Sequence, residues 1–278
     1  MTPTSKPYST HIKPASVSGA EVIRFTRITE ANKDRRIAIV GDSGHGKTYS
    51  LVAFLKMGLK VYLISSDIGG SGSRTIHEEF TDNPEVLEKN FFEIPITSYQ
   101  EMNAWLDDPE ANGGNLHTFN PDIIAWDGYC NFQKNDLMGY ILKIPAESKK
   151  GVTTKVRQEG LKAEIGDWDC LGRGTTQITN DFLRLESPSG KPYHKVITMM
   201  LKDVEPKEGE VKPKAPGPDI SGSAKKSVPG GFDWILLTVR DTNLRGEDTY
   251  SYRVLKQRGK RLGKVEEGDM GKLWEKLK

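Results

Sequence analysis

The chain has very little cysteine, no long apolar run and almost no net charge. Its two cysteines, Cys130 and Cys170, show no paired ligand spacing, which argues against both a disulfide framework and a zinc site. No apolar run approaches the roughly 20 residues of a membrane span, and the N-terminus lacks the apolar core of a signal peptide. The net charge is only +2, so a nucleic-acid-binding surface would have to be local. These absences predict a soluble, cytoplasmic protein without a membrane partner.

The pattern of the chain predicts one α/β domain behind a tail. Residues 1 to 20 contain no acidic residue, three prolines and many hydroxyl side chains, which is typical of a disordered segment. From residue 21, beginning with EVIRFTRI, strand-like and helix-like segments alternate up to residue 278. This alternation predicts βαβ units in a mostly parallel sheet with helices on both faces and antiparallel strands toward the C-terminus. A polar loop is expected from Lys202 to Gly231.

A complete Gly-x-x-x-x-Gly-Lys-Thr pattern follows the apolar strand RRIAIV. Gly41 and Gly46 allow tight turns that aim backbone N–H groups inward, Lys47 can reach the β- and γ-phosphates, and the Thr48 hydroxyl can ligate Mg²⁺. The helix predicted over TYSLVAFLKMG points its positive N-terminal end at the phosphates. The residues predicted to bind the nucleotide are Gly41, Asp42, Ser43, Gly44, His45, Gly46, Lys47, Thr48 and Tyr49.

Acidic residues after two apolar strands extend this predicted site. PDIIAWD ends in Asp127, which we expect to hold Mg²⁺ beside the phosphate loop, whereas Asp122 is expected to be a solvated turn residue. Hydrolysis also needs a carboxylate that orients the attacking water. Asp67 ends VYLISSD, the strand expected beside the phosphate loop, and is the first candidate, with a helix or loop cap as the equal alternative. Glu78 and Glu79 are fallback candidates on what is expected to be a solvated helix face.

Taken in order, six segments resemble the phage-encoded RecA-like P-loop ATPases: GDSGHGKT, SSDIGG, IIAWDGY, VITMML, PGGFDWILLTV and VLKQRGKR. More narrowly, they are similar to the phage single-strand annealing and AAA-type nucleotide-binding proteins, over about residues 21 to 262. The resemblance implies a RecA-like core that binds ATP and Mg²⁺, forms homo-oligomers with shared ATP sites, and binds or anneals single-stranded DNA. It also implies the cytoplasm of a bacterial host, and a single-strand binding protein as a second partner.

The resemblance assigns further catalytic roles residue by residue. RecA-like proteins usually carry Asp-x-Glu after the strand that follows the first helix, and the Glu is the base. The corresponding letters here run from Asp67 to Gly69, so either Asp67 substitutes for the base or turnover is slow. Lys256 and Arg258 match a Lys-x-Arg element that reaches into a neighbouring subunit's ATP site, where an inserted cation stabilises the transferring phosphoryl group. A solvated basic hairpin end is the alternative.

DNA contact is expected in the acid-free segment SKKGVTTKVR and in the loop that begins at Lys202, because RecA-like DNA-contacting loops follow the second motif, which is PDIIAWD in this chain, and the next central strand. Flexible Lys and Arg neutralise phosphates without a base code, and Trp168 or Tyr129 can stack on a base. A solvated charge run is the alternative. The predicted DNA-binding residues are Lys149, Lys150, Lys155, Arg157, Trp168, Arg173 and Lys202.

Two other functions use the same nucleotide site. The chain can be an NTPase loader or motor that acts on a protein partner, or a small-molecule kinase, which is disfavoured because no Arg-rich lid follows the second motif.

Trp126 and Phe132 are expected in the core, and His194 is expected to be structural. The side chain of His45 is expected to point away from the nucleotide.

Overall fold

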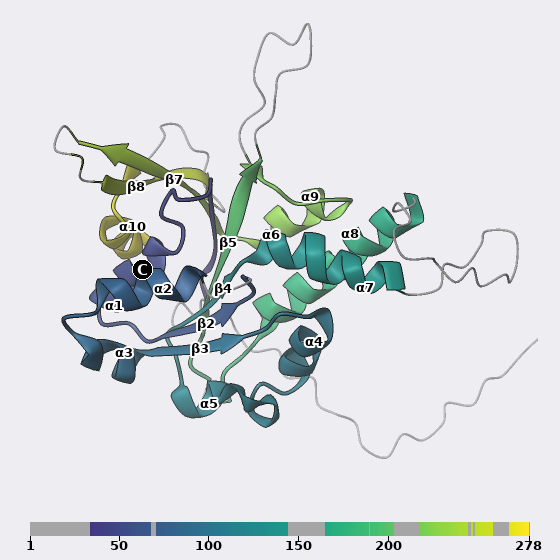
Figure 1. Cartoon of the computed structure of the whole chain (residues 1–278), viewed down its shortest axis with the longest axis horizontal. Helices are drawn as coiled ribbons and strands as arrows, with labels where there is room; N and C mark the ends of the chain where they lie inside the picture. The colour runs from purple at the N-terminus through teal and green to yellow at the C-terminus, as the bar shows by residue number, and fades with distance from the viewer. Residues whose placement is uncertain are drawn as a thin grey trace, which may run out of the picture.

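The computed structural model describes residues 34–67, 71–143, 165–188, 190–202, 217–243, 246, 248–257 and 267–277. This part of the chain forms a nine-stranded sheet in the order β3-β2-β4-β5-β1-β7-β8-β9, with β6 paired to β5 (Figure 1). The strands are β1 (Arg36–Gly41), β2 (Val61–Ser65), β3 (Phe91–Pro95), β4 (Ile123–Asp127), β5 (His194–Lys202), β6 (Gly217–Pro218), β7 (Trp234–Thr242), β8 (Asp248–Gln257) and β9 (Glu267–Gly268).

The sheet is parallel from one edge to β7. Each pairing among β3, β2, β4, β5, β1 and β7 is parallel, whereas β8 pairs antiparallel with β7, and β9 with β8. The predicted α/β class, with antiparallel strands toward the C-terminus, is therefore confirmed. The strand predicted over EVIRFTRI and the predicted tail lie outside the described residues.

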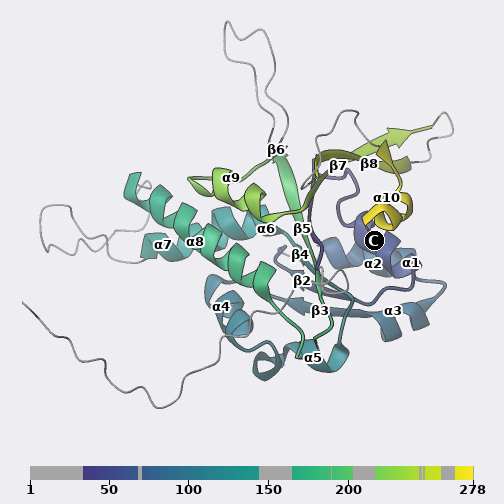
Figure 2. The same ribbon diagram turned by 180° about the vertical axis from the view of Figure 1, so that it is seen from behind.

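Helices cover both faces of the sheet. Figures 1 and 2 show α1, α2 and α10 on one side and α6, α7 and α8 on the other. No helix in the described ranges is long and apolar enough to cross a membrane. The α-helices are α1 (Tyr49–Lys56), α2 (Ser71–Glu79), α3 (Pro84–Asn90), α4 (Tyr99–Asp107), α5 (Leu116–Phe119), α6 (Tyr129–Asn131), α7 (Met138–Lys143), α8 (Ile165–Arg184), α9 (Ala224–Ser227) and α10 (Met270–Leu277). Two π-helical turns, η2 (Glu110–Gly114) and η3 (Phe132–Leu137), and one 3₁₀ turn, η4 (Val228–Gly231), complete them.

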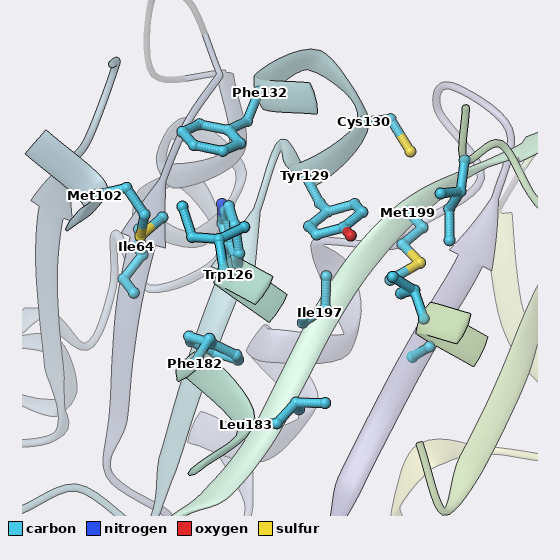
Figure 3. Close-up of a cluster of buried hydrophobic side chains, with 14 of the residues drawn as sticks. Ile64, Met102, Trp126, Tyr129, Cys130, Phe132, Phe182, Leu183, Ile197 and Met199 are labelled. Carbon is cyan, nitrogen blue, oxygen red and sulfur yellow. The ribbon is translucent and has the colours of Figure 1, made fainter. Parts of the chain in front are cut away.

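Strand side chains alternate between two apolar clusters, one on each face of the sheet. On β4, Ile123 and Ala125 join the cluster formed with α1, α2 and α10, whereas Ile124 and Trp126 join the cluster formed with α4 and α8 (Figure 3). Trp126 is 0% exposed and Phe132 is 1% exposed, which confirms that both are core residues. By the same alternation, Asp127 lies on the face that α1 covers.

The polar loop predicted from Lys202 to Gly231 is wrong in its second half. There the chain forms β6, α9 and η4. Ala224 and Val228 are buried and pack into the α8 side of the core. A few small apolar residues anchor this segment, although its overall composition is polar and rich in glycine and proline.

Candidate nucleotide-binding site

Parallel strands bring their carboxyl ends to one edge of the sheet, and a cavity of about 690 Å³ lies there. One wall is the loop between β1 and α1, including Lys47 and Thr48. The other wall combines residues that follow β2 and β4 with side chains from β5 and β8. The cavity is therefore built where the sequence predicts the phosphates to bind.

The phosphate loop has the backbone geometry that its glycines predict, with one difference. Gly44 and Gly46 have φ values of +75° and +80°, in the left-handed region that favours glycine. Gly41 does not have a positive φ, so it is not needed for a tight turn. A Cβ atom at Gly41 would collide with the Thr238 hydroxyl of β7, so close packing of β7 against β1 requires the glycine.

Behind the loop, α1 begins at Tyr49 and buries Leu51, Phe54 and Leu55 completely or almost completely. This is the inner face expected for a helix whose N-terminus lies at the cavity. The backbone N–H groups of its first turn carry the partial positive charge of a helix N-terminus.

Three chain segments meet at the carboxylate of Asp127, which is 3% exposed. The Thr48 hydroxyl donates a hydrogen bond of 3.0 Å to Oδ2 of Asp127, and the Thr198 hydroxyl of β5 donates to Oδ1. Burial raises the pKa of the Asp127 carboxyl, while these two hydrogen bonds act to lower it. The predicted Mg²⁺ residues, Thr48 and Asp127, therefore lie together.

Lys47 lies in the same cavity, and its Nζ donates a 2.7 Å hydrogen bond to the carbonyl oxygen of Asp42. Burial lowers the pKa of Lys47, although the negative charge of Asp127 acts to raise it. Burial thus disfavours the charged forms of both Lys47 and Asp127. An anion beside Lys47 and a cation beside Asp127 would supply the missing stabilisation.

Mg²⁺ fits the oxygen atoms that face this cavity. In the described ranges no group of three or more His, Cys, Asp or Glu side chains is arranged to hold a metal by itself. Mg²⁺ commonly uses only one or two carboxylates and takes its remaining ligands from water and substrate phosphates. The Asp127 carboxylate and the Thr48 hydroxyl would hold such an ion.

Asp67 also lines the cavity, but its strand is not where the sequence predicts it. β2 pairs with β3 and β4, whereas the neighbours of β1 are β5 and β7, so the expectation of β2 beside the phosphate-loop strand is wrong. The crossover through α1 passes β5 and β4 before the chain re-enters the sheet. Asp67 reaches the cavity because it follows the carboxyl end of β2, and the Asn131 side chain of α6 donates a 2.8 Å hydrogen bond to its carboxylate.

The fallback acids on α2 have the solvated positions expected of them. Glu78 and Glu79 are exposed. Glu79 forms an ion pair of 2.9 Å with Lys56 of α1, so its carboxylate is engaged at the surface. Gly69, the position of the missing glutamate, lies outside the described residues.

Two polar residues at the amino ends of β4 and β5 are structural. Asp122 lies in a bend before β4 with its side chain 28% exposed, as predicted, and its carboxylate also accepts a 2.8 Å hydrogen bond from the Lys60 backbone and pairs with Lys191 at 2.7 Å. His194 accepts a 3.1 Å hydrogen bond from the Arg35 backbone at Nδ1, and burial lowers its pKa to about 4. His194 is therefore structural, as predicted.

Several cavity residues escaped the sequence prediction, among them Asn131, Thr198 and Tyr250. Thr198 left a detectable signal, since it is a polar residue inside the apolar run VITMM. Asn131 and Tyr250 left none, because a polar residue in a helix and a tyrosine in an alternating strand are ordinary there. Their place in the cavity follows only from the packing of distant segments.

The predicted DNA-binding residues that are described lie at the surface. Trp168 is 45% exposed on α8. Arg173, also on α8, pairs with Asp169 at 3.1 Å, and Lys202 ends β5. The predicted contacts outside the described residues are Lys149, Lys150, Lys155 and Arg157.

Tyr129 cannot stack on DNA, so that prediction is wrong. Its side chain is 1% exposed, its hydroxyl shares a 2.8 Å hydrogen bond with Thr179, and its ring meets the edge of Trp126 (Figure 3). The ring is anchored in the core because it is part of the short helix that directly follows β4.

The proposed trans-acting cation Lys256 is engaged within its own chain. Its Nζ donates hydrogen bonds of 2.6 Å and 2.9 Å to the carbonyl oxygens of Pro229 and Phe232. Arg258 lies outside the described residues. The side chain of Lys256 therefore ties the end of β8 to η4.

A comparison of the sequence with protein-family models and with curated proteins finds no match. The chemistry of the site must therefore be argued from its residues and their arrangement.

Proposed function

We propose that this chain is a RecA-like P-loop ATPase that binds ATP and Mg²⁺ in the cavity behind the phosphate loop. The observation that supports this most strongly is the 3.0 Å hydrogen bond between Thr48 and Asp127, residues 79 positions apart. The phosphate-loop pattern assigns the Thr48 hydroxyl to Mg²⁺, and the second motif assigns Asp127 to the same ion. In an ordinary Gly-rich turn, nothing would favour a hydrogen bond from the Thr48 hydroxyl to the buried carboxylate of Asp127.

In this proposal the residues around the cavity divide the work of hydrolysis. Lys47 leaves the Asp42 carbonyl and contacts the β- and γ-phosphates, where its charge offsets the charge that develops during transfer. Asp127 and Thr48 would hold Mg²⁺, which would supply positive charge beside the phosphate oxygens. Asp67, oriented by Asn131, accepts a proton from the water whose oxygen bonds to the γ-phosphorus, while the bond to the β,γ-bridging oxygen breaks and ADP leaves. An aspartate is shorter than a glutamate, which favours slow turnover.

We further propose that the protein binds or anneals single-stranded DNA in phage-type recombination or replication. Support comes from the exposed indole of Trp168 on α8, which follows the basic segment SKKGVTTKVR in sequence, and from Lys202 at the start of the second predicted loop. An aromatic ring on which bases stack, together with flexible cations, binds single strands without a base code. The proposal of a homo-oligomer with shared ATP sites rests on the resemblance. Because Lys256 is hydrogen-bonded within its own chain, Arg258 is the residue proposed to reach the neighbouring subunit's ATP site.

Calorimetric titration of ATP, with and without Mg²⁺, tests the nucleotide site. Lys47→Ala should lose ATP binding, since it removes the mobile cation of the phosphate loop. Lys89→Ala, which removes an exposed lysine from α3, should bind ATP like the parent. If folded Lys47→Ala binds ATP as tightly as the parent, the proposal is wrong.

The rate of ATP turnover with and without single-stranded DNA tests the second part. A recombinase-like protein should change its rate, whereas a kinase or a loader specific for protein should not. Joint replacement of Lys149, Lys150, Lys155 and Arg157 by Ala should flatten the salt dependence of single-strand binding, by about 0.7 in the log–log slope for each lost phosphate contact. A quadruple variant with the parental slope would place the DNA site elsewhere.

A further inference from the structure

We propose that Tyr250 and Tyr49 form the platform on which the nucleobase of the bound nucleotide stacks. Both rings line the cavity, and they come from strand β8 and from the first residue of α1. The inference rests on the proposed function, because it concerns the part of the ligand beyond the phosphates. It adds Tyr250, which lies 201 positions after Tyr49, to the binding site.

The two rings form a defined pair. Their centroids are 4.8 Å apart and their planes meet at 34°. The Lys56 ammonium lies 5.4 Å from the Tyr49 centroid, and the Tyr49 hydroxyl lies 3.5 Å from both Lys56 Nζ and a carboxylate oxygen of Glu79. These contacts fix the Tyr49 side chain through Lys56 of its own helix and Glu79 of α2, in a position where both tyrosines line the cavity.

The β7–β8 hairpin holds Tyr250 directly against the phosphate loop. A Cβ atom at Gly46 would overlap the Tyr250 ring, so the ring touches the loop where a side chain would otherwise stand. Two residues further along β8, the Tyr252 hydroxyl accepts a 2.9 Å hydrogen bond from Ser50 of α1. The platform and the phosphate loop are thus fixed to each other.

The orientation of a bound nucleotide follows from the two ends of the site. Thr48 and Asp127 would hold Mg²⁺ together with the terminal phosphates, while the loop N–H groups would hold the α- and β-phosphates. The nucleoside must therefore leave the phosphate loop from the α-phosphate, past the N-terminus of α1. Tyr49 is the first residue of that helix, and Tyr250 packs on it.

Stacking on an aromatic face stabilises every base, because each base has a π-face. The platform should therefore contribute similarly to the binding of ATP and GTP, and nothing to the binding of inorganic tripolyphosphate, which has the phosphates alone. This difference separates base stacking from a merely structural role of Tyr250 in supporting the loop.

The experiment measures the affinities of ATP, GTP and tripolyphosphate, each with Mg²⁺, for the full chain and its variants. Tyr250→Leu should bind both nucleotides about ten-fold or more weakly and tripolyphosphate with the parental affinity, whereas Tyr250→Phe should bind all three like the parent. Tyr49→Leu, which removes the other ring, should lose affinity for the nucleotides in the same way.

The chain contains a matched control pair. Tyr99 and Tyr140 have centroids 4.7 Å apart at the same interplanar angle of 34°, and Tyr99 lines a different pocket. Tyr99→Leu should leave all three affinities unchanged. Equal weakening of all three ligands by Tyr250→Leu would show that the ring only supports the loop, and parental affinity for all three in both Tyr250→Leu and Tyr49→Leu would exclude the platform. A parent protein that binds neither nucleotide nor tripolyphosphate would instead refute the proposed function.

Discussion

The two walls of the cavity are built in different ways. The first wall is continuous in sequence: the loop after β1 and the first turn of α1 supply its glycines, Lys47 and Thr48. The second wall is assembled from segments after β2 and β4, from β5 and from the β7–β8 hairpin. A continuous wall can be recognised from the spacing of its letters, because neighbouring backbone groups form it. An assembled wall exists only once the sheet has formed, since its residues are far apart along the chain.

The largest expected effect comes from the acid of the assembled wall. Asp127→Asn keeps the size of the side chain but removes the charge that holds Mg²⁺ in the proposed site, so ATP turnover should fall about 100-fold or more, with a smaller loss of ATP affinity. Because burial raises the pKa of Asp127, its ionised form opposes folding near neutral pH. The variant without ligand should therefore melt a few degrees higher than the parent at pH 7.

Turnover assays and thermal melts of the ligand-free protein check both expectations. Asp82→Asn, at an exposed position between α2 and α3, should change neither quantity. Parental turnover by Asp127→Asn at limiting Mg²⁺ would assign the metal to Asp67 instead.

The contact between the two walls is tested by glycine substitution. Gly46 and Gly58 both have positive φ, at +80° and +78°, but only Gly46 faces a neighbour within 4 Å. Either change to Ala should cost about 1–2 kcal/mol of stability through backbone strain. Gly46→Ala should also push Tyr250 away and weaken ATP binding about ten-fold or more, the amount that a stacked base contributes.

Denaturant unfolding of the two glycine variants measures the loss of stability, and ATP titration measures the loss of ATP affinity. If Gly46→Ala and Gly58→Ala behave alike in both measurements, the hairpin does not shape the phosphate loop.

The support of the assembled wall depends on Gln133, one residue into η3 and two residues after Asn131. Gln133 is 1% exposed. Its side-chain amide donates a hydrogen bond of 2.9 Å to the Thr175 hydroxyl and accepts one of 2.9 Å from the Ser221 backbone N–H. Gln133→Leu leaves buried polar groups without partners and should lower the free energy of unfolding by about 2–3 kcal/mol. Gln177→Leu, at an exposed position on α8, should change it by less than about 0.5 kcal/mol in denaturant melts. Similar values for both variants would mean that the Gln133 network contributes little.

The smallest effect is expected at the opposite end of β5, at His194. Folding lowers its pKa from 6.5 to about 4, so the neutral ring stabilises the fold above pH 6.5, and this contribution is lost as the pH falls from 6.5 toward 4. Between pH 7 and pH 5 the parent should lose about 1–2 kcal/mol from this group. Chemical denaturation at the two pH values should show a smaller loss in His194→Gln, and the full parental loss in His77→Gln, which changes an exposed histidine. Equal losses in all three proteins would assign the pH dependence to other groups.

Much of the fold could be predicted because its signals are local. The continuous apolar run before Asp127 identified β4, and apolar spacing identified the buried face of α1, whereas the two faces of β4 were assigned only by the structure. The order of strands could not be predicted: two strands, β4 and β5, lie between β2 and β1, because the length of a crossover does not specify how many strands it passes. The helices of residues 217–231 were missed because composition describes a segment's average polarity and not the few residues that anchor it.

The sequence by itself determined the glycine-rich loop before α1, the strand that ends at Asp127, and the α/β class. These depend on backbone conformations and periodicities that neighbouring residues set. Only the tertiary structure decided that Thr48 and Thr198 share the Asp127 carboxylate, that Asn131 orients Asp67, and that Tyr250 lies on Gly46. Those contacts join residues separated by many turns of chain, and they form only where the carboxyl ends of the strands are brought together at one edge of the sheet.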